Sequence, residues 1–566
     1  MKATFINFRN LSFSIIILLA LAKMDVFAQN QTELLKSKNP YDATIFPNET
    51  VTYQNPVIPG FYSDPSICRV GEDYYLVSST FEYFPGVPIF HSKDLVNWEQ
   101  IGHCIHRKEQ LPDGVNIFAA NIRYRDGIFY MITTNVNGFG KGNFYVTATN
   151  PAGPWSNPIW IDQKLQWIDP DFFFDDDGKS YVIASNFELF EIDLETGKLL
   201  NEGRKIWYGT GGRALEGPHI YKKDGFYYLM AAEGGTEEAH SETIARSSSV
   251  WGPYITYKNN PILTHCNQAG QMYEIQGVGH ADIIQAHDGS WWMVFHGYRK
   301  IDRNVHFILG RETCLAPVTW PKNSWPIVNG NGTVQSNMTC STLPLKPFSE
   351  KSAKTDFNEA KLGLGWNYIQ LPVDENYSLS ERPGFLRLIG ASNNISPIES
   401  PIFIGESGSP TFVGRRLQHH NFTATTSMEF YPENENEEAG ITLVNNGVSF
   451  RLMVEKIGGE RYVTVKLDFG MITHKSEKKL LKPGPVKLRI QGETTTFAFS
   501  FSQGDDDYQI VETINSKFLS SESVGGYTGV YVGLYATGNG KASKAMADYD
   551  WFEYVKDEML VPSVTF

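Results

Sequence analysis

The sequence predicts an all-β protein with two domains, a five-bladed β-propeller followed by an antiparallel β-sandwich. One pattern of turn, strand, Asp turn and aromatic strand occurs five times between about residues 50 and 335. After residue 353 this repeat stops, and strands of alternating polar and apolar residues follow. The chain also contains 50 glycines, 29 prolines and 13% aromatic residues, a composition typical of short strands joined by many turns.

The five copies are similar enough in length and pattern to be one repeated unit. They are DPSICRVGEDYYLVSS from Asp64, AANIRYRDGIFYMITT from Ala119, DPDFFFDDDGKSYVIAS from Asp169, GPHIYKKDGFYYLMAA from Gly217 and HADIIQAHDGSWWMVFH from His280. Their turn aspartates are separated by 53, 51, 47 and 64 residues, a period that suits a four-stranded propeller blade. Because an Asp-Gly turn between apolar runs favours a hairpin, each copy is predicted to supply the inner hairpin of one blade.

The predicted domain order is a signal peptide at 1–28, the propeller at 50–335, a polar linker at 336–352 and the sandwich at 353–566. The chain begins with basic residues, an apolar run over 11–22 and a small-residue cleavage pattern that ends at Ala28. The apolar run is shorter than the roughly 20 residues a membrane span needs, and no second one follows. We therefore expect export, to the periplasm or the medium, after cleavage near Ala28, with no membrane span in the mature chain.

Charge and composition narrow the class of ligand. The formal net charge is -14 and basic residues do not cluster, which argues against nucleic acid as a partner. Abundant aromatic residues in an acidic protein are compatible with carbohydrate, whose apolar faces stack on rings. The five cysteines match no zinc spacing, and we expect them to be buried small hydrophobes.

The propeller geometry brings distant residues to one place. In a propeller the first strand of each blade lines the central axis, so the starts of the five copies are predicted to meet around one pocket. The residues at these positions are Asp64, Ala119, Asp169, Gly217 with Glu216 before it, and His280. Three carboxylates gathered in one pocket favour a split of their protonation states, as acid and base catalysis requires.

Hydrolysis of a glycosidic bond needs one carboxylic acid and one carboxylate. Asp64, short and followed by a proline, suits the base, and Glu216, with its longer arm, suits the acid. Asp169 would lie between them and raise the pKa of Glu216. Taken alone, an Asp before a proline is more often a turn residue, and Asp171 would replace Asp169 if the register were shifted by two.

Other candidate site residues have two interpretations each. His280 is either a structural histidine or a pocket residue that makes a hydrogen bond or holds a metal. Arg311 forms a surface ion pair or donates to a ligand hydroxyl or a catalytic carboxylate. Phe81 and Phe118 are core residues or sugar-stacking rings. We expect no required cofactor and assign no metal ligand, while a structural calcium ion near the propeller axis stays an open alternative.

Taken together, these motifs resemble glycoside hydrolase family 43, which includes β-xylosidases and α-L-arabinofuranosidases. The segments that carry the resemblance are NPVIPGFYSDPSICRVGEDYYLVSSTFEYFPGVPIFHSKDLVNW from Asn55, IDPDFFFDDDGKSY from Ile168, EGPHIYKKDGFYYLMAAEGGT from Glu216, GHADII from Gly279 and LGRET from Leu309. The resemblance implies an inverting hydrolysis with Asp64 as base, Asp169 as pKa modulator and Glu216 as acid. It also implies substrate contacts from Phe81 and Arg311, with His280 close to the pocket floor.

The second domain is similar to the concanavalin-like jelly-roll sandwich of the xylosidase branch, in which a sandwich loop blocks one side of the pocket. The resemblance therefore implies an exo-acting enzyme that removes terminal xylose or arabinofuranose from hemicellulose oligosaccharides, with β-xylosidase as first expectation. An arabinofuranosidase, an endo-acting arabinan or xylan hydrolase and a non-catalytic glycan-binding protein are the alternatives. Where much of the family has Trp-Ala-Pro, this chain has Phe118-Ala119-Ala120, so its sugar preference is an open point.

Overall fold

The computed structural model describes residues 50–136, 142–267, 270–301, 306–341, 344–349, 351–396 and 409–557. The predicted signal peptide at 1–28 lies outside these ranges. Regular structure within them is almost entirely strand, which confirms the all-β class. None of the helices in the described ranges is long and apolar enough to cross a membrane.

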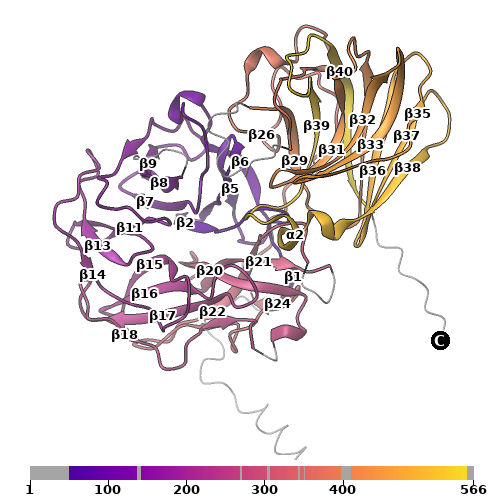
Figure 1. Ribbon diagram of the computed structural model, residues 1–566. Coiled ribbons are helices and arrows are strands. Elements are labelled where there is room, and N and C mark those ends of the chain that lie inside the picture. The colour runs from indigo at the N-terminus through magenta and orange to yellow at the C-terminus, as the bar shows by residue number, and fades with distance from the viewer. Residues whose placement is uncertain are drawn as a thin grey trace, which may run out of the picture. The chain divides into compact units, whose positions relative to one another are not determined.

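Five antiparallel sheets form the predicted propeller around a common centre, and each contains a path of four strands (Figure 1). Blade 1 is β2 (Ser66–Val70), β3 (Asp73–Val77), β5 (Gly86–Ser92) and β6 (Glu99–Ile105); blade 2 is β7 (Asn121–Arg125), β8 (Ile128–Asn135), β9 (Gly142–Ala148) and β10 (Ile159–Trp160). Blade 3 is β11 (Asp171–Phe174), β12 (Ser180–Ile183), β13 (Glu188–Glu191) and β14 (Arg204–Lys205). Blade 4 is β15 (Glu216–Lys223), β16 (Phe226–Glu233), β17 (Ser241–Ser247) and β18 (Ile255–Thr256), with β19 (Leu263–Thr264) beside β17. Blade 5 is β20 (Ile275–Gln285), β21 (Trp291–Arg299), β22 (Glu312–Thr319) and β23 (Ile327–Val328).

Two Asp-Gly turns close inner hairpins as the sequence predicts, whereas in blade 1 the turn is Gly71-Glu72 and the expected turn residue Asp73 is the first residue of β3. Asp126 and Gly127 have φ angles of 52° and 85°, and Asp224 and Gly225 have angles of 53° and 79°. Both residues of each turn are thus left-handed, which is the geometry of a two-residue turn that matches the twist of its strands. The turns fix the register of β7 with β8 and of β15 with β16.

Apolar clusters between neighbouring blades hold the ring together. Each of five clusters draws its buried side chains mainly from two adjacent blades. The cluster between blades 5 and 1 contains Trp292 and Val294 from β21 and Tyr74 and Leu76 from β3. Because this last cluster joins the end of the repeat to its beginning, the ring is closed by side-chain packing.

A pair of strands outside the blades also joins the two ends of the propeller. β1 (Thr50–Gln54) pairs with β24 (Asn337–Ser341), and both contribute buried side chains to the cluster between blades 5 and 1. β24 lies within the predicted linker at 336–352, so the first part of that segment is a strand rather than an irregular connection. Its sequence NMTCS lacks a clear apolar alternation, and its strand structure depends on a partner about 290 residues earlier in the chain.

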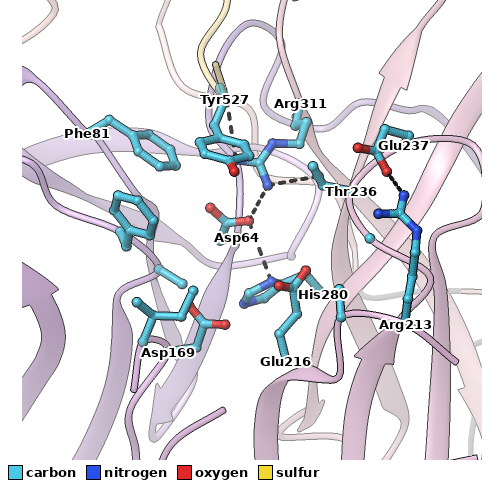
Figure 2. Close-up of a pocket in the computed structure, with 15 residues that line it drawn as sticks. Asp64, Phe81, Asp169, Arg213, Glu216, Thr236, Glu237, His280, Arg311 and Tyr527 are labelled. Carbon is cyan, nitrogen blue, oxygen red and sulfur yellow. Dashed lines mark hydrogen bonds and ion pairs between the residues drawn. The ribbon is translucent and has the colours of Figure 1, made fainter. Parts of the chain in front are cut away.

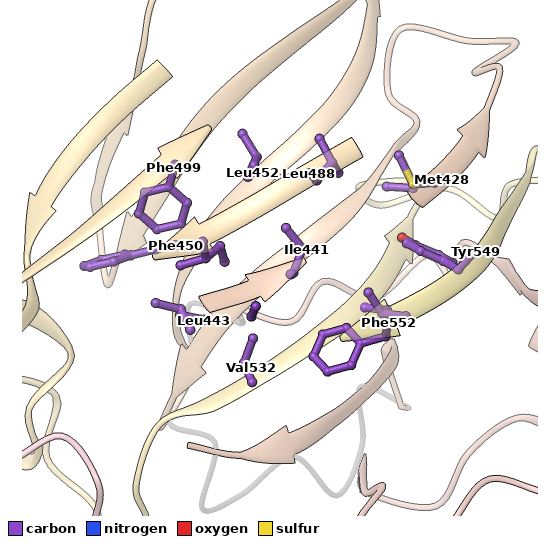
Figure 3. Close-up of a cluster of buried hydrophobic side chains, with 14 of the residues drawn as sticks. Met428, Ile441, Leu443, Phe450, Leu452, Leu488, Phe499, Val532, Tyr549 and Phe552 are labelled. Atoms are coloured by element: carbon purple, nitrogen blue, oxygen red, sulfur yellow. The ribbon is translucent and has the colours of Figure 1, made fainter. Parts of the chain in front are cut away.

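Two antiparallel sheets form the sandwich and enclose one large apolar core (Figure 3). The first sheet contains β25 (Lys354–Thr355), β27 (Tyr377–Ser378), β28 (Leu386–Ile389), β40 (Met546–Lys556), β30 (Phe422–Phe430), β36 (Val486–Glu493), β37 (Thr496–Ser502) and β38 (Gln509–Asn515). The second contains β29 (Thr411–Arg416), β39 (Tyr531–Thr537), β31 (Glu438–Asn445), β32 (Val448–Ile457), β33 (Glu460–Phe469), β34 (Ile472–Lys475) and β35 (Lys479–Leu480). Inward side chains such as Ile441, Leu452 and Phe499 alternate along these strands, as expected for packed sheets.

The sandwich is attached to the first blade through backbone pairing and stacked rings. β26 (Tyr368–Ile369) pairs with β4 (Tyr83–Phe84), a short strand that follows β3 in the propeller. The ring of Tyr83 stacks on that of Tyr531 from β39 at a centroid distance of 3.8 Å. A buried cluster of residues from both domains surrounds this contact, so the two domains share apolar surface next to the propeller axis.

A buried ionic network crosses the propeller axis below the pocket. Arg123 donates from Nη1 to Asp282 Oδ2 at 2.7 Å and from Nη2 to Asp171 Oδ2 at 2.6 Å. Both carboxylates are almost fully buried, and His219 Nδ1 lies 2.8 Å from the same oxygen of Asp171. One guanidinium therefore bridges two carboxylates that belong to different blades.

We predict that Arg123→Met destabilises the chain by about 3–5 kcal/mol, because two buried carboxylates lose their counter-charge. Arg125→Met is the matched control, since Arg125 lies on the same strand but pairs with the exposed Asp126. The control is expected to cost about 1 kcal/mol or less. Thermal unfolding measures both, and equal midpoints for the two variants would contradict this account of the axis.

Candidate active site

A pocket of about 180 Å³ opens at the propeller axis and contains the residues that the repeat predicts to converge (Figure 2). Its lining includes Asp64, Ala119, Asp169, Glu216 and His280, one from each of the five copies. Phe81, Phe118 and Arg311 line it as well, so every residue assigned to the site from sequence lies in this one pocket.

The repeat also determines the backbone conformation at the pocket. Asp64, Asp169, Gly217 and His280 have φ angles of 54°, 55°, 58° and 51°, so four equivalent positions are left-handed. Such angles are uncommon for residues other than glycine. At Gly217 a Cβ atom would lie 3.0 Å from His280 Nε2, which explains why glycine occupies this copy and why its carboxylate comes from the residue before.

Asp64 is held as a carboxylate by donors on both of its oxygens. Oδ1 accepts from Arg311 Nη1 at 2.7 Å and lies 3.0 Å from His296 Nδ1. Oδ2 accepts from Ser79 Oγ at 2.6 Å and lies 2.9 Å from Ser63 Oγ. Burial alone would raise the pKa of Asp64, but the charge of Arg311, with contributions from the nearby histidines, holds it well below its usual range.

Glu216 has the opposite environment. Among the described residues its carboxyl group has no hydrogen-bond partner, and it lies near two other carboxylates in the same pocket. Burial, then the charge of Asp169 and then that of Asp64, raise the pKa of Glu216 to about 8. Glu216 is therefore protonated at neutral pH, while Asp64 is ionised.

Asp169 shares a feature with each of these groups: its carboxylate accepts hydrogen bonds, as that of Asp64 does, and its pKa is raised, as that of Glu216 is. Its Oδ2 accepts from Ser185 Oγ at 2.9 Å and from the backbone N–H of Gly217 at 3.2 Å, and that second bond fixes it against the residue next to Glu216. Burial raises the pKa of Asp169, and Asp64 raises it further, although His280 opposes both. Asp171 pairs with Arg123 in the network below the pocket, so Asp169, and not the alternative Asp171, lines the pocket.

A stack of histidines lies behind Asp64, and sequence reasoning identified one of the three. His280 Nδ1 lies 3.6 Å from Asp64 Oδ1, and His296 stacks on His240 at a centroid distance of 4.8 Å. Burial, together with the charge of Arg311, lowers the pKa of His296 to about 3, so this ring is neutral. His296 is the last residue of the apolar segment of the fifth copy. A polar residue at the end of such a segment is the sequence signal that could have identified His296 as a site residue.

Asp64, His280 and His296 are also the group whose donor atoms lie closest to metal-binding geometry within the described residues. Calcium prefers six to eight oxygen ligands, whereas this group offers one carboxylate and two ring nitrogens. The guanidinium of Arg311 already neutralises that carboxylate. These residues therefore do not fit the calcium ion that the sequence left open.

Three aromatic rings form one wall of the pocket, and one of them comes from the sandwich. Phe81 lies 4.9 Å from Phe118 and 5.6 Å from Tyr527, measured between ring centroids. The Tyr527 carbonyl accepts from Arg311 Nη2 at 3.3 Å, which ties the sandwich loop to the pocket. Tyr527 was not identified from sequence, because nothing near it in the chain marks it as a neighbour of the propeller axis.

The opposite rim contains an ion pair between Arg213 and Glu237, both mostly exposed. The loop that carries Arg213 is anchored by the buried carboxylate of Glu233. This carboxylate accepts from Thr210 N at 2.6 Å, Thr210 Oγ1 at 2.7 Å and Gly212 N at 2.9 Å. Glu233 is the last residue of β16, the aromatic strand of the fourth blade, and sequence reasoning did not identify it either.

Comparison with known proteins gives matches over both domains. Residues 53–326 match glycosyl hydrolases family 43, and residues 354–555 match the beta xylosidase C-terminal concanavalin A-like domain. The chain is 42% identical to the non-reducing end alpha-L-arabinofuranosidase BoGH43B of Bacteroides ovatus, over 89% of this chain and 94% of that protein. It is 38% identical to a xylosidase/arabinosidase of Butyrivibrio fibrisolvens, over 89% of this chain and 99% of that protein. The solved structure of GH43B from a Bacteroides ovatus xyloglucan locus superposes with a TM-score of 0.84 at 41% identity, covering 90% of this chain and 100% of that one.

We predict that Glu233→Gln loosens the loop at 209–214, because an amide nitrogen would face backbone N–H donors that need an acceptor. The loss of about 1–3 kcal/mol of local stability should speed amide hydrogen exchange in this loop by about 10-fold to 100-fold. Glu202→Gln, at an exposed glutamate that pairs with Lys164, is the control, with little change expected in the loop amides. Unchanged exchange in Glu233→Gln would show that the loop does not depend on this carboxylate.

Proposed function

We propose that this chain, which belongs to glycoside hydrolase family 43, removes single terminal pentoses from hemicellulose-derived oligosaccharides by inverting hydrolysis. One observation carries the proposal. The pocket holds an ionised Asp64 and a protonated Glu216, and these are the two states that glycosidic hydrolysis requires.

Asp64 is the proposed general base. Its two oxygens are oriented by Arg311 and His296 on one side and by Ser79 on the other, so the carboxylate cannot rotate away from the pocket. In an inverting reaction it takes a proton from the water that attacks the anomeric carbon. Its low pKa keeps it ionised over a wide pH range, at some expense in basicity.

Glu216 is the proposed general acid, which protonates the oxygen of the leaving sugar as the glycosidic bond breaks. The proton must stay on the carboxyl group until that moment, and the raised pKa supplies this condition at neutral pH. Asp169 contributes by its charge, and its hydrogen bond to Gly217 N holds it beside Glu216. Asp169 thus acts through Glu216 and need not exchange a proton with substrate.

The size of the pocket supports exo action. The pocket is compact, about 180 Å³, and residues bound it on two sides. Tyr527 and Phe118 bound one side, and Arg213 and Glu237 bound the other. Such a pocket suits a terminal sugar better than the middle of a polysaccharide.

The choice between xylose and arabinofuranose depends on similarity to other proteins, since no contact in the pocket distinguishes the two sugars. The 42% identity with the Bacteroides ovatus arabinofuranosidase favours arabinofuranose as the first substrate to test. The β-xylosidase expected from sequence is the second candidate, supported by the xylosidase/arabinosidase of Butyrivibrio fibrisolvens. Export with cleavage near Ala28 stays a prediction, which N-terminal sequencing of the mature protein would test.

We predict that Glu216→Gln and Asp64→Asn each lower kcat/KM about 10²-fold to 10⁴-fold on nitrophenyl α-L-arabinofuranoside and β-xyloside. The unmodified chain is expected to cleave at least one of the two and to release an inverted sugar, which proton NMR of the fresh product detects. Glu202→Gln, at an exposed glutamate that pairs with Lys164, serves as the carboxylate control and should retain most activity. Full activity in both catalytic variants would refute the assignment.

The pH dependence of kcat/KM should have an alkaline limb near pH 8, because the acid must keep its proton and the pKa of Glu216 is about 8. In Asp169→Asn the neighbouring negative charge is gone, the pKa of Glu216 falls, and the alkaline limb should move to lower pH. Asp177→Asn changes an exposed turn residue of the same blade and should leave the limb in place. A limb that stays near pH 8 in Asp169→Asn would argue against the proposed role of Asp169.

A further inference from the structure

A second and larger cavity lies between the first blade and the sandwich, away from the pocket at the axis. Its volume is about 620 Å³, and its walls include Tyr62 and Gln100 from the propeller and Trp366, Arg415 and Gln418 from the second domain. The proposed hydrolysis uses none of these five side chains.

Arg415 occupies a position where the strand pattern calls for an apolar residue. Side chains alternate between the faces of a strand, so Val413, Arg415 and Leu417 share one face of the chain at β29. Val413 and Leu417 are fully buried in the sandwich core. Arg416, on the other face, packs over the ring of Tyr62 at 4.4 Å.

The guanidinium of Arg415 has no hydrogen-bond acceptor among the described residues. Within the described residues no carboxylate, carbonyl or hydroxyl group accepts a hydrogen bond from it, and its nearest aromatic neighbour is Trp366, with Cζ 6.0 Å from the ring. Burial lowers the pKa of Arg415, as expected for a charge without compensation. Its side chain is half-buried and lines the cavity, so a planar guanidinium with five N–H donors and no protein acceptor within the described residues faces whatever enters there, and an anionic ligand suits it.

We propose that this cavity binds the carboxylate of an acidic sugar, a uronic acid, through the guanidinium of Arg415. A planar guanidinium binds a carboxylate through two parallel hydrogen bonds. The Nε2 atoms of Gln100 and Gln418 already donate within the protein, and their Oε1 atoms offer acceptors for sugar hydroxyls. Trp366 and Tyr62 offer apolar surface. The choice of a sugar as the molecule that carries the carboxylate rests on the proposed function. The choice of a carboxylate as the bound group rests on the guanidinium of Arg415.

Charge at the cavity mouth supports an anion. Lys351, Lys354 and Lys361 line the cavity together with Arg415, against the acids Asp356 and Glu359. The lining therefore carries an excess of positive charge in a protein whose formal net charge is -14. Such a local reversal of sign favours binding of anions over neutral sugars.

Calorimetric titration of the full mature chain with D-glucuronic acid, D-glucose and acetate tests the proposal. Glucuronic acid should bind at least tenfold more tightly than either glucose or acetate, because only it has both the carboxylate and the ring. Acetate binding as tightly as glucuronic acid would overturn the assignment to a sugar. Absence of binding by all three would overturn the site.

Variants localise the binding. Arg415→Gln should weaken glucuronic acid binding at least tenfold, Arg415→Lys should weaken it less, and Arg204→Gln, an exposed arginine on β14, should leave it unchanged. Equal affinity in Arg415→Gln and the unmodified chain would refute the proposal.

Hydrolysis of nitrophenyl pentosides separates this inference from the proposed function. Arg415→Gln should cleave these substrates at the rate of the unmodified chain, which also demonstrates a folded protein. If the unmodified chain cleaves no pentoside, the proposed function fails while the Arg415-dependent binding of glucuronic acid can still be measured. Loss of hydrolysis in Arg415→Gln would contradict a site that is distinct from the catalytic pocket.

Discussion

Neutralisation of buried carboxylates at the ring axis is the constraint on which this structure depends. A propeller brings the first strand of every blade to its centre, and in this chain three of the five copies place a carboxylate there. Like charges cannot share a space with little water unless each has a counter-charge or keeps its proton. The protein uses both solutions, since Arg311 compensates Asp64 and burial leaves Glu216 protonated.

Charged residues gather in two layers along the axis, at positions two residues apart in each copy. The first position of each copy faces the pocket and contains Asp64, Asp169 and His280. The position two residues later lies below, where Asp171, His219 and Asp282 gather around Arg123. In the upper layer the charges are left partly unbalanced, which keeps a proton available for chemistry. In the lower layer Arg123 bridges the two carboxylates by direct ion pairs, and the network contributes to the structure of the ring.

Sequence alone predicted the features that recur within the chain. The five copies and their Asp-Gly turns identify the blades, because the relevant interactions are local and repeated. The convergence of Asp64, Asp169, Glu216 and His280 followed from the same register. Family resemblance then favoured the pocket role for Phe81 and Arg311, for which the residues alone left two interpretations.

The features that sequence did not predict depend on contacts between distant segments. β24 became part of a predicted linker because its partner, β1, lies at the other end of the propeller. Tyr527 reaches the pocket from a loop of the sandwich, and its own surroundings in the chain are polar and unremarkable. His296 and Glu233 are polar residues at the ends of apolar strands, and their roles depend on which neighbours the fold supplies.

The long separation between Asp64 and its partners gives this enzyme an order of events during synthesis. His296 and Arg311 follow Asp64 by 232 and 247 residues. At about 5–20 residues per second, a ribosome needs roughly 12–50 s to supply them after Asp64 has emerged. Until then the aspartate lacks the groups that hold its pKa low, and Asp64 and Glu216 do not yet face each other across a pocket. The proposed catalytic pair is therefore assembled only when the ring closes, and we expect a chain that stops short of its fifth blade to be inactive.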